Sequence, residues 1–225
     1  CRPILAHMLK GLDAEPDPRL KEYNRLVGKL KMVYEDDVFV VVNKPSGLLS
    51  VPGKEFLPSV ESITGCLSVH RLDQDTSGLL VLAKSLAVQA ELRRQVEQRE
   101  VQKRYEAILE REMPVGEEGE IRLPLRPDIE NRPRQIVDMA HGKSALTRYK
   151  VIGNTDGHAH LQLVLHTGRT HQLRVHCAEA FGNPILGDRL YGREVASRLM
   201  LHAGELSFTH PKTGERLCFT CTPEW

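Results

Sequence analysis

The order of apolar segments along the chain restricts its fold more than any other feature. Short runs rich in Val, Ile and Leu, such as residues 38–42, 78–83 and 161–165, outnumber the segments with a helical apolar stripe. Runs of this kind, bounded by Gly, Pro and Asp, are typical of β-strands. Because these strands do not alternate regularly with helices, the pattern disfavours a doubly wound parallel fold. It predicts an α+β fold with a mixed, largely antiparallel β-sheet flanked by helices.

Three segments have the apolar spacing of helices. The first follows Asp17 and Pro18, which suit the N-cap and the first helical position. The second follows Ser85, another N-cap residue. The third is expected over residues 170–180, and its core side would carry Leu173, Cys177 and Ala180. We therefore expect residues 1–31 to form an N-terminal helical extension and residues 32–225 to form the main domain. A chain that begins with Cys rather than Met is expected to be a fragment.

Composition narrows the class of protein further. The longest stretch without a charged residue, 157–168, is 12 residues long, whereas a membrane-spanning helix needs about 20 apolar residues. Five cysteines without a framework of spacings suggest reduced thiols and a cytoplasmic protein. Cys218 and Cys221 form a lone C-x-x-C, and His158 and His160 would share one face of a strand. Because neither pair has further ligands at suitable spacing, no metal site is expected.

The net charge of +1, from 31 basic and 30 acidic residues, hides a local asymmetry. Residues 157–178 contain no Asp or Glu, but they hold Arg169, Arg174 and five of the ten histidines. Such a segment suggests contact with the phosphates of a nucleic acid. Since aromatic residues make up only 5% of the chain, rows of stacking rings are not expected. Recognition would rest on phosphate contacts, shape and a few bases taken into a pocket.

A polar loop between two predicted strands, residues 70–77, is the best candidate for chemistry. Its Asp73 is either a turn-capping residue or a nucleophile or base in a pocket. A buried carboxylate stays ionised when an arginine lies nearby, and Arg71 and Arg174 are candidates for that role. His171 and Arg174 are three residues apart in a predicted helix and share a face. These residues support a site without naming a reaction.

Residues 70–78 (HRLDQDTSG) resemble the signature loop of the RluA family of pseudouridine synthases. The resemblance continues in the family's order over about residue 33 to the C-terminus. Its further motifs are residues 43–53 (NKPSGLLSVPG), 103–105 (KRY), 168–176 (GRTHQLRVH), 184–188 (PILGD) and 201–203 (LHA). The set of motifs in one order is far more specific than any one of them.

The resemblance implies a pseudouridine synthase catalytic fold with a central active-site cleft, in which uridine in RNA is converted to pseudouridine. The N-glycosidic bond breaks, the base turns and it rejoins through carbon 5, without a metal, nucleotide or redox cofactor. Asp73 would be the catalytic aspartate, attacking either the sugar or the base. Arg174 would pair with Asp73 and keep it charged. Tyr105 would stack on the target base and is a candidate to take the carbon 5 proton.

The resemblance also implies a set of RNA- and base-binding residues. Arg71 would fill the space that the flipped uridine leaves in the helix, which lowers the cost of extrusion. Leu201 is a candidate for an apolar wall of the base pocket. The full set of expected binding residues is His70, Arg71, Arg169, His171 and Leu201.

Residues 48–53 and 131–133 are most similar to family members that lack an S4-like RNA-binding domain. Those members act on 23S ribosomal RNA and on transfer RNA, so the expected partner is RNA. The protein is expected to be a cytoplasmic monomer without membrane contact. The alternative is a non-catalytic RNA-binding or ribosome-assembly factor on the same scaffold. An acid/base hydrolase has less support, because no G-x-S-x-G elbow and no spaced carboxylate pair occur.

Overall fold

The computed structural model describes residues 24–53 and 57–225. Residues 24–28 are helical and lead into the first strand of the sheet. The earlier part of the expected N-terminal helix, including Asp17 and Pro18, lies outside the described residues. Leu26 of the helical stretch is buried and belongs to the main hydrophobic core.

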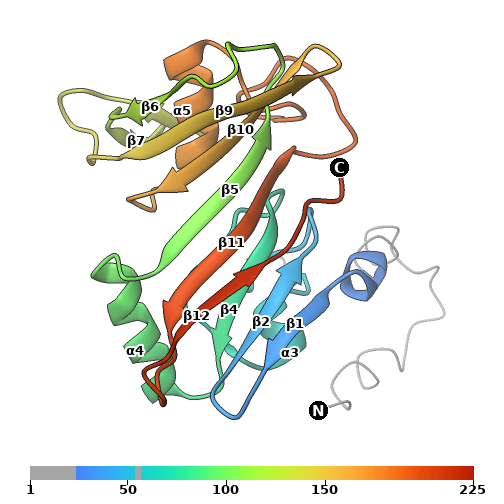
Figure 1. The fold of residues 1–225 in the computed structure, drawn as a ribbon, viewed down its shortest axis with the longest axis vertical. Helices are drawn as coiled ribbons and strands as arrows, with labels where there is room; N and C mark the ends of the chain where they lie inside the picture. The colour runs from blue at the N-terminus through green and yellow to red at the C-terminus, as the bar shows by residue number, and fades with distance from the viewer. Residues whose placement is uncertain (1–23, 54–56) are drawn as a thin grey trace.

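One large β-sheet runs the length of the molecule (Figure 1). Of its strand pairs, β4 and β11 are parallel and the others are antiparallel, which confirms the expected mixed, largely antiparallel α+β architecture. Two short strands, β7 (Leu125–Pro127) and β8 (Gln135–Val137), form a separate ribbon. The order in the sheet is β1 (Lys31–Glu35), β2 (Phe39–Lys44), β4 (Ser77–Ala83), β11 (Leu201–Thr209), β5 (Gln102–Ile108), β10 (His158–Leu165), β9 (Thr147–Thr155) and β6 (Glu118–Ile121), with β12 (Arg216–Thr220) on β11 and β3 (Leu67–Ser68) on β4.

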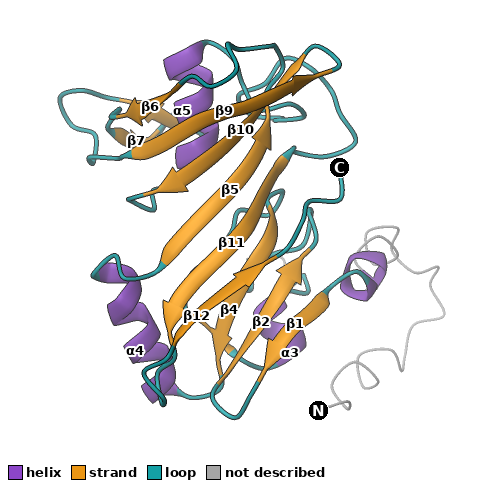
Figure 2. Ribbon diagram, in the orientation of Figure 1, coloured by secondary structure: helices purple, strands orange, loops and turns teal. Residues whose placement is uncertain are grey.

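The helices α3 (Val60–Thr64), α4 (Leu86–Glu97) and α5 (Gln172–Phe181) flank the sheet (Figure 2). Helix α4 packs on β3 and β4, and α5 packs on β8 and β9 at the other end. The Ser85 side chain caps α4 by accepting a hydrogen bond from the Val88 N–H, as expected. None of the helices in the described part of the chain has the length and apolar character that a membrane span requires.

The structure corrects two details of the predicted elements. Ala180 is exposed, because α5 is enclosed over residues 172–177 and its last turn emerges toward solvent. The acidic residues 116–120, which begin with Gly116, predict a turn from sequence, but they enter β6 from Glu118 onward. Pairing with β9 supplies the backbone hydrogen bonds there, so tertiary context overrides the composition.

The central strands are buried on both faces, and this makes them a rigid support for the loop that precedes β4. Successive side chains of a strand point to opposite faces of the sheet. Accordingly, the apolar residues of β2 and β4 divide between two core clusters on opposite faces. One cluster contains Val40, Val42, Leu80 and Leu82, and the other contains Phe39, Val41, Leu79 and Val81.

The close approach of β4 to β11 depends on Gly78. Its φ of +115° lies in a region that L-residues with side chains rarely adopt, and a Cβ there would lie 2.4 Å from the Ala203 carbonyl oxygen. The two backbones therefore meet without an intervening side chain. This contact places the loop before β4 close to the start of β11, which begins at Leu201.

Candidate active site

A pocket of about 310 Å³ lies where the loop before β4 meets β5, β11 and the start of α5. This volume is at the lower end of the range for small-molecule sites. All eight side chains that the sequence singled out for catalysis or base binding line it. They are His70, Arg71, Asp73, Tyr105, Arg169, His171, Arg174 and Leu201.

The loop that carries Asp73 is held in place by residues 44–50. The Ser50 hydroxyl accepts a hydrogen bond from the Leu72 N–H (3.1 Å) and donates one to the Leu72 carbonyl (2.8 Å). The Gln74 carbonyl accepts from the Gly47 N–H (2.9 Å) and from the Lys44 ammonium (2.8 Å). Both neighbours of Asp73 in the chain are therefore fixed through their backbones.

Lys44 is a buried cation beneath this loop. Its ammonium also donates to the carbonyls of Pro45 (3.0 Å) and Leu48 (2.7 Å), so three carbonyl oxygens share its three protons. Burial lowers the pKa of Lys44 to about 7, although the charges of Asp75 and Asp73 oppose the shift. The sequence analysis assigned Lys44 no role beyond its place in residues 43–53, and its contacts show that it supports the loop.

Asp73 is accessible from the pocket, because its side chain is 21% exposed. Its Oδ2 lies 4.0 Å from Nε2 of His171, which precedes α5 with a φ of +53°. The other ring nitrogen, Nδ1, is 2.8 Å from the Tyr191 hydroxyl. Burial lowers the pKa of His171, and the Asp73 charge opposes this shift only in part. The imidazole beside Asp73 is therefore neutral at neutral pH.

Arg174 does not form the expected ion pair with Asp73. Its Nε and Nη2 instead donate to the two carboxylate oxygens of Asp188, at 2.7 and 2.6 Å. This pair is almost fully buried, with 4% and 0% of the side chains exposed. The fork of a guanidinium matches a carboxylate in this bidentate way, so the nearer, enclosed Asp188 takes the hydrogen bonds. Arg174 still lines the pocket with Asp73, and the Asp73 charge contributes to raising the Arg174 pKa.

Tyr105 and Leu201 form the buried wall of the pocket, with 5% and 3% of their surface exposed. Burial raises the pKa of Tyr105, and the Asp73 charge adds to the shift. The phenol is therefore protonated at neutral pH. Its ring remains available for stacking on a planar ligand.

His70 and Lys103 place further nitrogen atoms at the same pocket. Neither ring nitrogen of His70 has a hydrogen-bond partner among the described residues, although both are buried. Burial lowers the pKa of His70 well below its usual value, and the charge of Lys103 adds to this shift. Burial also lowers the pKa of Lys103 to about 8.

The two remaining arginines lie at the mouth of the pocket and are exposed. Arg169 donates from Nε to the Ser144 carbonyl (3.1 Å). The Arg71 side chain makes no hydrogen bond or ion pair with another residue in the described ranges 24–53 and 57–225. It is therefore free to reorient when a ligand enters.

Sequence reasoning missed the residues that organise this pocket. Asp188 stands in the motif of residues 184–188 but received no role, because nothing in the spacing shows that it meets Arg174. Tyr191 was not considered, yet it holds His171 and lies over Arg174, whose guanidinium carbon is 5.3 Å from the ring centroid. Across the described residues, no group of three or more His, Cys, Asp and Glu side chains is placed to hold a metal ion.

Residues 38–179 match the family model described as RNA pseudouridylate synthase, so the chain belongs to that family. The solved structure of human RNA pseudouridylate synthase domain containing 1 is similar, with a TM-score of 0.74 and 30% sequence identity. The similarity covers 94% of this chain and 86% of the human one. Human RNA pseudouridylate synthase domain containing 4 gives a TM-score of 0.71 at 25% identity, covering 91% and 94%.

Among curated proteins, the dual-specificity RNA pseudouridine synthase RluA of Haemophilus influenzae is 43% identical, covering 92% of this chain and 99% of that protein. RluA of Escherichia coli K12 is 46% identical, covering 84% and 91%. The chain is thus an RluA-type member of the family, as the order of its motifs indicated. RNA pseudouridine synthases are isomerases, so the comparisons also identify the class of enzyme.

Proposed function

We propose that this protein converts specific uridine residues in RNA to pseudouridine, with Asp73 as the nucleophile. The observation that carries the proposal is the convergence of Asp73, Tyr105 and Arg174 on one pocket together with the five expected binding residues. A carboxylate that forms a covalent intermediate divides one difficult step into two easier ones. Membership of the family supports the reaction, and the shared pocket supports the roles proposed for these residues.

In this mechanism the target uridine leaves the stacked RNA and enters the pocket. The Asp73 carboxylate attacks either the ribose or the base, and the bond between them breaks. The detached base turns, a new bond forms from the ribose to carbon 5, and the bond to Asp73 breaks, which releases the carboxylate. The proton of carbon 5 is lost, and nitrogen 1 gains one. No atom enters or leaves overall, as an isomerisation requires.

The neighbouring groups leave the Asp73 carboxylate accessible from the pocket. The guanidinium of Arg174 contributes positive charge at longer range, even though it is paired with Asp188. His171 stays neutral, so it does not neutralise the nucleophile by forming a tight ion pair. The protonated phenol of Tyr105 favours stacking on the base over accepting the carbon 5 proton. Arg71 is free to occupy the gap in the RNA.

We propose further that the substrates include both ribosomal and transfer RNA. The support is the identity of 43–46% to proteins named dual-specificity RNA pseudouridine synthase RluA. We also propose that the protein acts as a monomer, since one chain supplies all eight side chains of the pocket. Similarity to bacterial RNA pseudouridine synthases supports the further proposal that it acts in the cytoplasm.

The test is incubation of the purified protein with unmodified transcripts of 23S ribosomal RNA and of transfer RNAs. Pseudouridine is then mapped by primer extension after carbodiimide treatment. We expect new stops at a small number of uridines in both kinds of RNA. Binding of RNA without any conversion would contradict the proposal and would instead support a non-catalytic assembly factor.

A further inference from the structure

A second pocket, of about 550 Å³, lies on the other side of the loop that carries Asp73. Gln74 and Asp75 of that loop line it together with Ser77, the first residue of β4, whereas Asp73 and Thr76 line the active-site pocket. Cationic side chains from three parts of the chain surround it. They are Arg25, Lys29, Lys31, Lys44, Arg189 and Arg198.

Three of these six cations are already engaged by the protein. Lys31 forms an ion pair with Glu224 at 2.6 Å. Lys44 donates its protons to three backbone carbonyls. Arg198 donates to the Ser77 hydroxyl and to the Glu224 carbonyl (3.2 Å), and its guanidinium carbon lies 5.6 Å from the centroid of the Trp225 ring.

The other three cations are available to a ligand. Arg25, Lys29 and Arg189 are exposed, and within the described part of the chain their side chains form no hydrogen bond or ion pair. The carboxylates that line the same pocket are Glu224, which is paired with Lys31, and Asp75. Within the described ranges, the pocket therefore has an excess of positive charge that no carboxylate neutralises.

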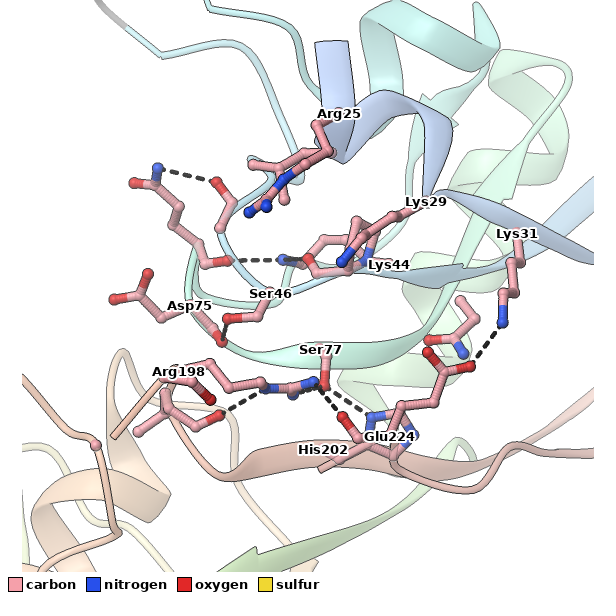
Figure 3. A pocket seen from close by; sticks show the side chains of 18 of the residues that line it. Arg25, Lys29, Lys31, Lys44, Ser46, Asp75, Ser77, Arg198, His202 and Glu224 are labelled. Carbon is pink, nitrogen blue, oxygen red and sulfur yellow. Dashed lines mark hydrogen bonds and ion pairs between the residues drawn. The ribbon is translucent and has the colours of Figure 1, made fainter. Parts of the chain in front are cut away.

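The cations face one another across the pocket. Arg25 and Lys29 are four residues apart, and Figure 3 shows both extending over the pocket from one side while Arg198 lies on the opposite side. Leu26 between them is buried in the core, where its Cδ1 would lie 3.2 Å from a Cβ on Gly47. Burial of this leucine fixes the segment that carries the two cations.

A third hollow, of about 340 Å³, connects the second pocket with the active site. It shares Asp73, His171 and Arg174 with the active-site pocket, and it shares Gln74 and Asp75 with the second pocket. The three hollows thus follow one another around the loop. A polymer with one residue at Asp73 is able to reach the cationic pocket without leaving the surface of the same protein.

We propose that the second pocket binds backbone phosphates of the RNA strand that flanks the target nucleotide. The inference rests on the proposed function. Exposed Arg and Lys side chains around an open hollow suit the phosphates of a flexible chain, because such contacts require charge rather than a fixed set of buried donors. The pocket thereby fixes the position of the strand relative to Asp73.

The test compares two double variants that each remove two positive charges. In Arg25→Gln/Lys29→Gln the charges come from the pocket. In the control, Lys150→Gln/Lys212→Gln, they come from exposed positions on β9 and on the turn between β11 and β12. Binding of a fluorescent RNA that the wild type modifies is measured at several salt concentrations.

We expect the pocket variant to bind about tenfold more weakly at 0.1 M salt. The slope of log K against log salt should fall by about 1.5, since each phosphate contact contributes about 0.7–0.9. In the control, both the loss of affinity and the change in slope should be less than half of those in the pocket variant. Equal affinity and slope in the pocket variant and the wild type would overturn the proposal.

Two further arms identify the source of the phosphate. In one arm, a single phosphate near the target uridine is replaced by an uncharged methylphosphonate, one position at a time. At some position this replacement should weaken binding by the wild type, but it should not weaken binding by the pocket variant any further. Inorganic phosphate and uridine monophosphate are tested as small anions. If either binds the wild type but not the pocket variant, while both proteins bind RNA equally well, the pocket binds a small anion and the proposal is wrong. If the wild type modifies no RNA, the proposed function is contradicted. If the wild type modifies RNA but the pocket variant and the control bind it equally well, only the proposed role of the second pocket is contradicted.

Discussion

At the scale of single residues, Asp188 decides how charge is arranged around Asp73, the proposed nucleophile. It accepts two hydrogen bonds from Arg174 and two more from the N–H groups of Leu190 and Tyr191. These contacts hold the guanidinium in a fixed orientation beside the pocket. Arg174 thus acts on Asp73 through its charge, while two of its five N–H donors are committed to Asp188.

Replacing Asp188 by Asn should destabilise the protein by about 3 kcal/mol, because it leaves the buried Arg174 guanidinium without its counter-charge. The isomerisation rate should also fall, since the guanidinium is free to turn toward Asp73. Urea denaturation followed by circular dichroism measures the first effect. Asp156→Asn, in an exposed turn, is the matched control. An unchanged midpoint for Asp188→Asn would contradict this account of the pair.

At the scale of elements, β4 connects the hydrophobic core to the loop that carries Asp73. Its seven residues are all buried, and it pairs with β2, β3 and β11. The loop ending at Thr76 leads directly into it, so the position of Asp73 depends on how closely β4 approaches β11. That approach requires a residue without a side chain at position 78.

Gly78→Ala should therefore destabilise the protein by several kcal/mol, because its Cβ would overlap the Ala203 backbone and its φ is unfavourable. Gly153→Ala is the control, since no atom lies within 4 Å of its added Cβ and its φ is not positive. Thermal unfolding of both variants is the measurement. A melting temperature of Gly78→Ala within a few degrees of the control would be incompatible with the close approach of β4 to β11 described above.

Elements with a regular local pattern were predictable from sequence, and those formed by pairing were not. β4 is a continuous apolar run and α4 has a capping Ser85, so both could be located. All five residues of β1 are exposed, so its sequence lacks the alternation that marks a half-buried strand. The eight side chains that line the pocket were predictable through their motifs. The partner of Arg174 was not predictable, because both Asp73 and Asp188 are candidates and only their distances from Arg174 in the folded protein decide between them.

At the scale of the whole molecule, buried histidines connect stability to pH. His202 is buried, its Nδ1 lies 2.8 Å from the Ser77 hydroxyl, and burial lowers its pKa to about 4. Burial also lowers the pKa of His70, His171 and His176. Because the usual value is about 6.5, the unfolded chain binds more protons than the folded chain below that pH. The contribution of these groups is complete above pH 6.5 and is lost as the pH falls toward 4.

We predict that the free energy of unfolding falls by at least about 2 kcal/mol between pH 7.5 and pH 5.0. His202 alone accounts for that amount, at about 1.4 kcal/mol for each pH unit below 6.5. Carboxylates with a lowered pKa, such as Glu91 at about 2, act only at lower pH. Urea denaturation at several pH values measures the effect, and His202→Gln should make the dependence shallower. Constant stability over this range would show that the histidines are not buried in the neutral form.

The central claim is that Asp73 forms the covalent link on which isomerisation depends. The most direct measurement is the rate of pseudouridine formation by Asp73→Asn on an RNA that the wild type converts completely, with RNA affinity measured in parallel. We predict a rate at least about a thousandfold lower, with RNA affinity within a few-fold of the wild type, while the control Asp156→Asn keeps the full rate. A rate for Asp73→Asn within tenfold of the wild type would contradict the claim.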